Sequence, residues 1–187
     1  MKRKLDFKDI AGYLPYYLKV LIKRNFDIIG TAIGETNGYM RIFGEDAEDY
    51  FEESEDFIKP ILLPLSDLYR TIIHNGKEIV PIVELARICY SHIQNIEIRN
   101  GLGGKFCFVD RRLANHQFGF YFEEKTNSFR SVYLANYTDD IVINQYKLFD
   151  YLHELKIDYR GLIDAGLAID VNTLETNTYK LFNHETN

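Results

Sequence analysis

The amino-acid sequence predicts a single α+β domain over residues 1–187, with mainly antiparallel strands in hairpins and about two covering helices. Three observations lead to this prediction. The length of 187 residues is typical of one domain. Several segments alternate apolar and polar residues between short turns. Only two segments of useful length show helical apolar spacing, which is too few crossovers for a parallel doubly wound sheet.

The N-terminal part is predicted to form a short helix and then three strands. Residues 6–12 allow at most a short helix. Residues 16–23 (YYLKVLIK) alternate as a half-buried strand does. Residues 27–33 and 39–43 are predicted to be two further strands, joined by the turn-forming segment 34–38 (GETNG).

Two unusual segments follow these strands. Residues 45–56 (EDAEDYFEESED) hold eight carboxylates in twelve positions, so like-charge repulsion predicts a solvated acidic loop or a loose helical turn. Residues 57–68 contain Pro60 and Pro64, which argue against both a regular helix and a central strand.

The middle of the chain is predicted to hold one helix between hairpins. Asn75-Gly76 is typical of a tight turn. Residues 82–91 have the apolar stripe of a helix, with Pro81 suited to its first turn. The segment 100–104 (NGLGG) is predicted to be a turn between strands, and residues 117–124 and 129–137 are predicted to pair as a hairpin.

The C-terminal part is predicted to form the second helix. Residues 145–156 space their apolar side chains at helical intervals and are expected to bury four of them against the sheet. These four are Leu148, Phe149, Leu152 and Leu155. Residues 161–171 are expected to form a turn or short helix and a final strand, and the polar tail from about residue 175 is expected to fray.

Charge and cysteine content narrow the function classes. The formal charge of −6 disfavours nucleic acid as a partner, because phosphate contacts need a basic face. Cys89 and Cys107 are the two cysteines, too few for a disulfide framework, and reduced thiols in a cytoplasm are expected. No apolar run approaches the length of a membrane span or of a signal peptide. The sequence therefore predicts a soluble cytoplasmic protein without a membrane partner.

Four segments carry a resemblance to a known family: YLPYYLKV (13–20), KPILLPLSDL (59–68), NGKEIVPIVELARI (75–88) and FDYLHELKIDYRGLIDAGLAIDVNTL (149–174). They resemble a recurring family of small uncharacterised proteins found in Bacteroidota genomes and their phages. The family commonly has an arginine where Leu63 stands, and the acidic run and the central hairpin look variable. The resemblance implies a phage or prophage setting in a bacterial host cell, and it implies no chemistry.

Asp110, Glu123 and Lys125 form the sharpest enzymatic candidate. An Asp followed by Glu-x-Lys on the next strand is the pattern of metal-dependent nucleases, in which carboxylates hold the metal and the lysine steadies the attacking water. Charges also belong at a hairpin tip by strand alternation alone. The pattern is short, and the structural interpretation is favoured.

Two weaker patterns involve metal ligands and anion binding. Cys89, His92, Cys107 and His116 offer zinc-type ligands at irregular spacing. Residues 100–105 form a glycine-rich turn with Arg99, Arg111 and Arg112 nearby in sequence, but the turn lacks the Walker pattern. Buried thiols and an ordinary turn are the favoured interpretations. We therefore expect neither a metal nor a cofactor.

The acidic run remains as the candidate binding segment. A surface of this kind suits a basic protein partner, and the tentative partner-binding residues are Asp46, Asp49, Tyr50, Phe51, Glu52 and Glu53. A solvated loop is the alternative interpretation. The sequence thus favours a non-catalytic phage or mobile-element accessory protein that binds a host or phage protein, with a metal-dependent nuclease as the alternative.

Overall fold

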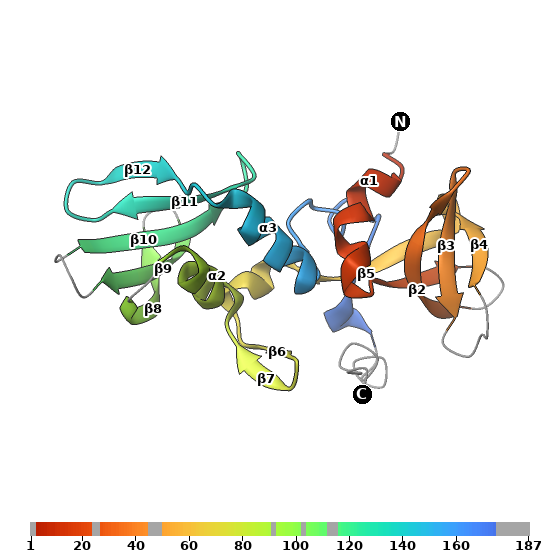
Figure 1. Ribbon diagram of the computed structural model, residues 1–187, viewed down its shortest axis with the longest axis horizontal. Helices are drawn as coiled ribbons and strands as arrows, with labels where there is room; N and C mark the ends of the chain where they lie inside the picture. Colours follow the sequence, from red (N-terminus) through yellow and green to blue (C-terminus); the bar gives the residue numbers. More distant parts are fainter. Residues whose placement is uncertain are drawn as a thin grey trace. The chain divides into compact units, whose positions relative to one another are not determined.

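The computed structural model describes residues 3–23, 27–44, 50–90, 93–101, 104–111 and 116–174. The chain divides into two compact units. Unit 1 comprises Met1–Leu65 and Leu152–Asn187, and unit 2 comprises Ser66–Tyr151. Mostly antiparallel strands with three α-helices confirm the α+β class at this coarse level (Figure 1). The single domain over residues 1–187 stays a prediction.

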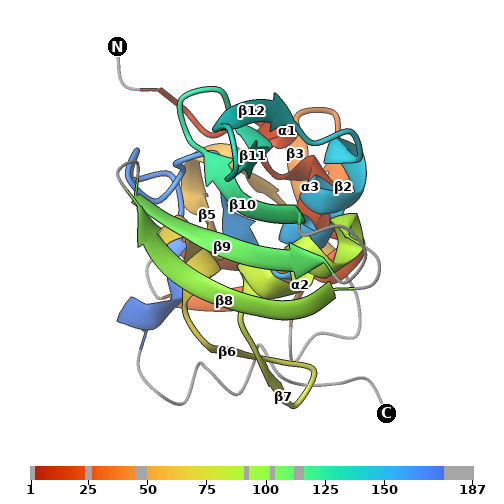
Figure 2. The same ribbon diagram turned by 90° about the vertical axis from the view of Figure 1, so that its left-hand side faces the viewer.

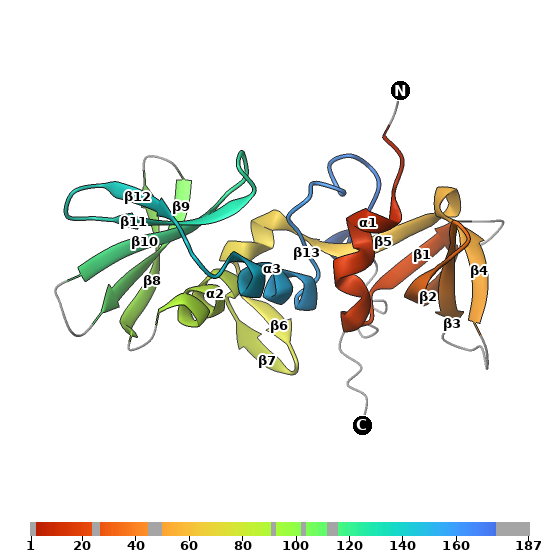
Figure 3. The same ribbon diagram turned by 45° about the horizontal axis from the view of Figure 1, so that its top comes forward.

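Unit 1 begins with a short helix and is built on one mixed sheet. The helical segments are α1 (Phe7–Ile10) and the 3-10 segment Ala11–Tyr16. The strands are β1 (Lys19–Lys23), β2 (Asp27–Thr36), β3 (Tyr39–Gly44), β4 (Tyr50–Ser54), β5 (Ile58–Pro64), β13 (Ile157–Asp158) and β14 (Ile169–Asp170). Their order is β13-β5-β1-β2-β3-β4, with β14 also paired to β5. Figure 3 shows β1 to β4 side by side, with β4 last in the row.

Local signals explain the N-terminal strands. Asp6 caps α1, because its side chain accepts the Lys8 N–H while the Asp9 side chain accepts the Asp6 N–H. Asn37 and Gly38 both have positive φ (54° and 82°), which suits the two-residue hairpin between β2 and β3. The predicted hairpin at residues 34–38 is confirmed.

Two predictions for residues 45–68 are wrong in part, since no regular helix forms at residues 57–68, as expected, and residues 45–49 lie outside the described residues. Residues 50–54 form the strand β4, since the hydrogen bonds to β3 satisfy the backbone that the predicted loop would have exposed to water. Residues 58–64 form the central strand β5 despite its two prolines. Pro60 ends the ladder with β1 and Pro64 ends the ladder with β13, so each missing N–H falls where pairing stops.

The core of unit 1 explains why β5 is apolar except at Lys59. β1 and β5 are buried on both faces: Val20, Ile22 and Leu62 belong to one apolar cluster, and Leu21 and Ile61 to a second. A strand that is buried on both faces has a continuous apolar run rather than an alternating one. The sequence IKPILLP fits this position.

Unit 2 is an antiparallel meander with helices on its apolar side. The strands β8 (Ile93–Gly101), β9 (Gly104–Arg111), β10 (His116–Glu123), β11 (Ser128–Tyr133) and β12 (Thr138–Ile141) pair in chain order. Figure 2 shows these five strands in succession. The unit also contains the hairpin β6 (Ile72–His74) and β7 (Lys77–Ile79), the helix α2 (Pro81–Cys89) and most of α3 (Gln145–Glu154).

Aromatic side chains form the core of unit 2. The Phe120 and Phe129 rings stack with centroids 5.6 Å apart, and Phe149 from α3 meets Phe129 edge-on at 5.6 Å. Tyr90, at the end of α2, stacks on Phe118 at 5.7 Å. The predicted helices at residues 82–91 and 145–156 are confirmed as α2 and α3, and the predicted hairpin at residues 117–137 is confirmed as β10 and β11.

Candidate protein-binding surface

Four of the six predicted binding residues lie on β4 and point alternately to two sides. Tyr50 is 43% exposed and Glu52 is also exposed. Phe51 packs against the apolar cluster of unit 1, and Glu53 is only 4% exposed. Tyr50 and Glu52 are thus on the exposed side of β4, whereas Phe51 and Glu53 are on its buried side. Asp46 and Asp49 lie outside the described residues.

The neighbouring strand β3 adds residues that the sequence analysis missed. In the β3–β4 register, Phe43 is opposite Tyr50 and Arg41 is opposite Glu52. Phe43 is 43% exposed and Tyr39 is 50% exposed. Tyr39, Arg41, Phe43, Tyr50 and Glu52 together are called the β3–β4 face below. The signal was present in the sequence, because YMRIF alternates these three residues with the buried Met40 and Ile42.

A cation–π contact organises this face. The Arg41 guanidinium lies over the Tyr50 ring, with its carbon 3.9 Å from the ring centroid. Glu52, directly across from Arg41, supplies a carboxylate on the same side of the sheet. The face therefore presents exposed aromatic rings with charges of both signs, a composition suited to binding rather than to catalysis.

The nuclease residues are not brought together. In the β9–β10 register Asp110 is opposite Gln117, six residues along β10 from Glu123. Six residues of strand span about 20 Å, too far for both carboxylates to hold one metal ion. Glu123 instead accepts a hydrogen bond from the Thr126 hydroxyl at 2.8 Å, and its carboxylate lies 3.6 Å from Arg130.

The predicted thiol and imidazole ligands do not form a described metal centre. Burial raises the pKa of Cys89 to about 11 and the pKa of Cys107 to about 12, so both thiols stay protonated at neutral pH. His92 and the side chain of His116 lie outside the described residues. Within the described parts of the chain no group of three or more His, Cys, Asp or Glu side chains is placed to hold a metal.

The proposed anion site is also divided. Arg99 and Lys105 lie beside the β8–β9 turn, whereas Arg111 pairs with Ile93 and His116 at the other end of β9. Arg99 forms an ion pair with Glu97, and its guanidinium lies 3.5 Å from the centroid of the Phe108 ring. These contacts give the arginine a structural role.

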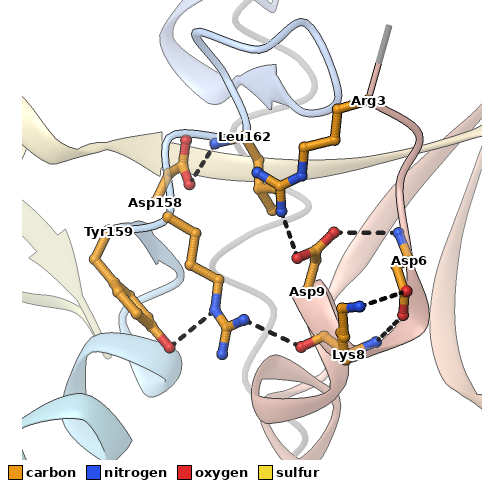
Figure 4. Close-up of polar contacts among 8 residues, drawn as sticks. Arg3, Asp6, Lys8, Asp9, Asp158, Tyr159 and Leu162 are labelled. Carbon is orange, nitrogen blue, oxygen red and sulfur yellow. Dashed lines mark hydrogen bonds and ion pairs between the residues drawn. The ribbon is translucent and has the colours of Figure 1, made fainter. Parts of the chain in front are cut away.

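Unit 1 contains a dense polar cluster that joins the two ends of its chain (Figure 4). Arg3 reaches the buried Asp9 at 2.5 Å, and Arg160 donates to the Lys8 carbonyl at 3.2 Å. The Asp158 carboxylate, 3% exposed, accepts the backbone N–H groups of Leu162 and Ile163 at 3.0 and 2.7 Å. These hydrogen bonds and the ion pair fix the N-terminal segment and the loop after β13 in place, so the cluster has a structural role.

A second group of contacts lies beside this cluster. His153 Nε2 is 2.8 Å from the Tyr159 hydroxyl, and Arg160 Nε donates to the same oxygen at 3.1 Å. The His153 ring meets the Tyr13 ring edge-on, and Tyr13 donates its hydroxyl hydrogen to the Ile157 carbonyl at 2.9 Å. A Cβ on residue 12 would lie 2.4 Å from His153 Cε1, so Gly12 makes room for the imidazole.

No comparison with known proteins assigns a function to this surface. Among the described residues, no helix has both the length and the apolar content needed to cross a membrane. No family model, no curated protein and no solved structure matches the chain.

Proposed function

We propose that this chain is a non-catalytic phage or mobile-element accessory protein that acts by binding a host or phage protein. The observation that carries the proposal is the β3–β4 face, where three exposed aromatic rings lie beside Arg41 and Glu52. The phage setting rests on the family resemblance of residues 13–20, 59–68, 75–88 and 149–174.

The composition of the face supports protein binding. Tyrosine and arginine are enriched among the residues that contribute most to protein interfaces. The stacking of Arg41 on Tyr50 holds both side chains before a partner arrives, which reduces the entropy lost on binding. Tyr39 and Phe43 add apolar surface on the same side of the sheet.

The nuclease alternative has weaker support. Asp110 is opposite Gln117 near the start of β10, whereas Glu123 is the last residue of β10, beyond the ladder with β9. A plasmid-nicking assay with Mg²⁺ or Mn²⁺ tests it directly, and we expect no cleavage. Cleavage that Glu123→Ala abolishes would favour the nuclease over the binding protein.

Affinity capture from a Bacteroidota lysate tests the proposed function. The variant Phe43→Ala/Tyr50→Ala removes two rings from the β3–β4 face. The matched control Tyr137→Ala/Tyr146→Ala removes two rings that are 79% and 69% exposed in unit 2. We expect proteins that are captured by the wild type and the control and lost with the face variant, while all three keep the same circular dichroism spectrum. An identical set of captured proteins for all three would contradict the proposal.

A further inference from the structure

We propose that Asn75, at the tip of the β6–β7 hairpin, is a modification site at which the side chain deamidates spontaneously with the help of His74. The reaction converts the asparagine to aspartate or isoaspartate, and water is its only co-reactant. The site goes beyond the proposed function, because the hairpin belongs to unit 2 and the β3–β4 face belongs to unit 1.

The residue after the asparagine supplies the nucleophile. The Gly76 backbone nitrogen bonds to Asn75 Cγ and gives up its hydrogen, while Nδ2 gains a proton and leaves as ammonia. Water then opens the resulting cyclic imide at either carbonyl, which gives aspartate or isoaspartate. Glycine has no Cβ that could hinder the attack. Both residues are exposed, so water reaches the site.

The conformation of the turn controls the reaction. Asn75 and Gly76 have positive φ (49° and 70°), which is typical of a two-residue hairpin. Attack on the Asn75 side chain requires the peptide plane between the two residues to rotate, so the turn must open first. The rate of deamidation therefore depends on how easily the hairpin opens locally.

The β6–β7 hairpin has few contacts that oppose this opening. Its strands form a separate two-stranded sheet with three residue pairs (Figure 3). Every residue from 72 to 79 is exposed or half-buried. A two-stranded hairpin is only marginally stable by itself in water. We therefore expect frequent opening of this turn in the folded chain.

His74 supplies a proton-transfer group beside the leaving nitrogen. Its Nε2 lies 3.2 Å from Asn75 Nδ2, the atom that leaves as ammonia. Histidine exchanges protons readily near neutral pH, so this imidazole can relay to Nδ2 the proton that Gly76 gives up. The imidazole ends the reaction with the same number of protons as it began.

A second Asn-Gly turn in the chain provides a matched comparison. Asn37 and Gly38 also have positive φ, but they join β2 and β3 within the larger sheet of unit 1. The Gly38 N–H donates to the Glu35 carboxylate at 2.6 Å, and this hydrogen bond must break before the turn can open. Asn37 should therefore react more slowly than Asn75.

The third Asn-Gly pair is in a different backbone environment. Asn100 and Gly101 lie in the β8–β9 ladder, opposite Lys105 and Gly104, and not in a two-residue turn. Asn37 is thus the appropriate control for Asn75.

Mass spectrometry of the incubated full chain measures both sites in one sample. Deamidation raises the mass by about 1 Da, and the tryptic peptides 71–77 and 25–41 separate the two asparagines. We expect Asn75 to react at least tenfold faster than Asn37 in the folded chain. In concentrated urea both turns are open, and the two rates should agree within about threefold.

A variant tests the contribution of the imidazole. His74→Phe keeps a ring at this strand position and removes the nitrogen, so it should slow the reaction of Asn75 at least threefold. The control Ile73→Phe adds a ring at the neighbouring position, which is 50% exposed, and should leave the rate unchanged. Equal thermal midpoints in circular dichroism show that both variants remain folded.

Three results would overturn the proposal. Equal rates for Asn75 and Asn37 in the folded chain would remove the site. A tenfold difference that persists in urea would show that the neighbouring sequence, and not the hairpin, sets the rate. Equal rates for the wild type and His74→Phe would show that the imidazole takes no part in the proton transfer.

Discussion

The two units differ in how far apart in the sequence their contacts lie. In unit 2 the five strands β8 to β12 pair in chain order, so most partners are joined by a turn. In unit 1 the central strand β5 pairs with β13 and β14, and Tyr13 bonds to Ile157, 144 positions away. Contacts within a meander follow from local signals, whereas those of unit 1 depend on closing long loops.

The cores differ in the same way. Unit 2 uses stacked and edge-on aromatic rings contributed by neighbouring strands and α3. Unit 1 uses mainly aliphatic side chains from both ends of its chain, such as Val20, Leu62 and Leu162. A single truncation in unit 2 thus removes several ring contacts at once. In unit 1 the aliphatic core itself joins the two segments of the chain, and the hydrogen bond from Arg160 to the Lys8 carbonyl adds to it.

The largest effect is expected where α3 crosses the boundary between the units. Leu152 is fully buried, and the boundary lies between Tyr151 and Leu152. Leu152→Asp places a carboxylate in the core at a cost on the order of 4–5 kcal/mol, a large part of the stability of a typical domain. We expect loss of the cooperative thermal transition in circular dichroism. Lys147→Asp, at an exposed position of the same helix, is the control; an unchanged midpoint for Leu152→Asp would contradict the placement of the helix.

Phe129→Ala tests the aromatic core of unit 2. The Phe129 ring contacts Phe120, Phe122 and Phe149 at centroid distances of 5.6, 5.1 and 5.6 Å. Its removal should lower the free energy of unfolding by about 3–5 kcal/mol, measured by urea denaturation. Tyr137→Ala, at a position that is 79% exposed, should change it little. A loss below about 1 kcal/mol for Phe129→Ala would indicate that the core relaxes around the cavity.

The contrast between the units also explains what the sequence predicted. The hairpins and both longer helices follow from turn residues and apolar periodicity, which act over a few positions. The prediction for β5 was wrong because Pro60 and Pro64 lie at the ends of its ladders, where no N–H group is needed. Where these ladders end depends on strands that are far away in the chain, so the sequence near the prolines does not indicate it. The pairing of β13 and β14 with β5 had no local signal.

The binding surface was predictable in part. The high density of carboxylates predicted a binding segment at residues 45–56. The alternation of side chains along β4 places Tyr50 and Glu52 on the exposed side of the strand and Glu53 on the buried side. A loop has no regular alternation of exposed and buried side chains, so the loop prediction did not indicate that Arg41 and Phe43 on the adjacent strand share this face. Neutralising Glu53 together with the exposed carboxylates would mix a change in the fold with a change in binding.

Gly12→Ala tests the long-range packing of unit 1. The new methyl group would lie 2.4 Å from the His153 ring, so the imidazole must move away from Tyr159. We expect a loss of about 1–3 kcal/mol in the free energy of unfolding. In a His153→Ala background the same change should cost much less, because the clash is gone. Equal costs in the two backgrounds would contradict this account.

The smallest perturbation is chemical labelling of the two cysteines, which tests whether unit 2 unfolds together with unit 1. Both cysteines of the chain, Cys89 and Cys107, lie in unit 2. Cys89 is partly exposed, whereas Cys107 is fully buried, so labelling of Cys107 reports the opening of that unit. Burial raises both thiol pKa values, to about 11 and about 12, and slow reaction with a disulfide reagent is therefore expected at pH 8. Since the unfolded thiols ionise at lower pH than the folded ones, their burial lowers the free energy of unfolding as the pH rises from about 9 toward the folded pKa values.

In a urea series at pH 8, a single cooperative domain predicts that thiol labelling and far-ultraviolet circular dichroism share one midpoint. A labelling midpoint that coincides with the first of two separate circular dichroism steps would show instead that unit 2 unfolds independently of unit 1.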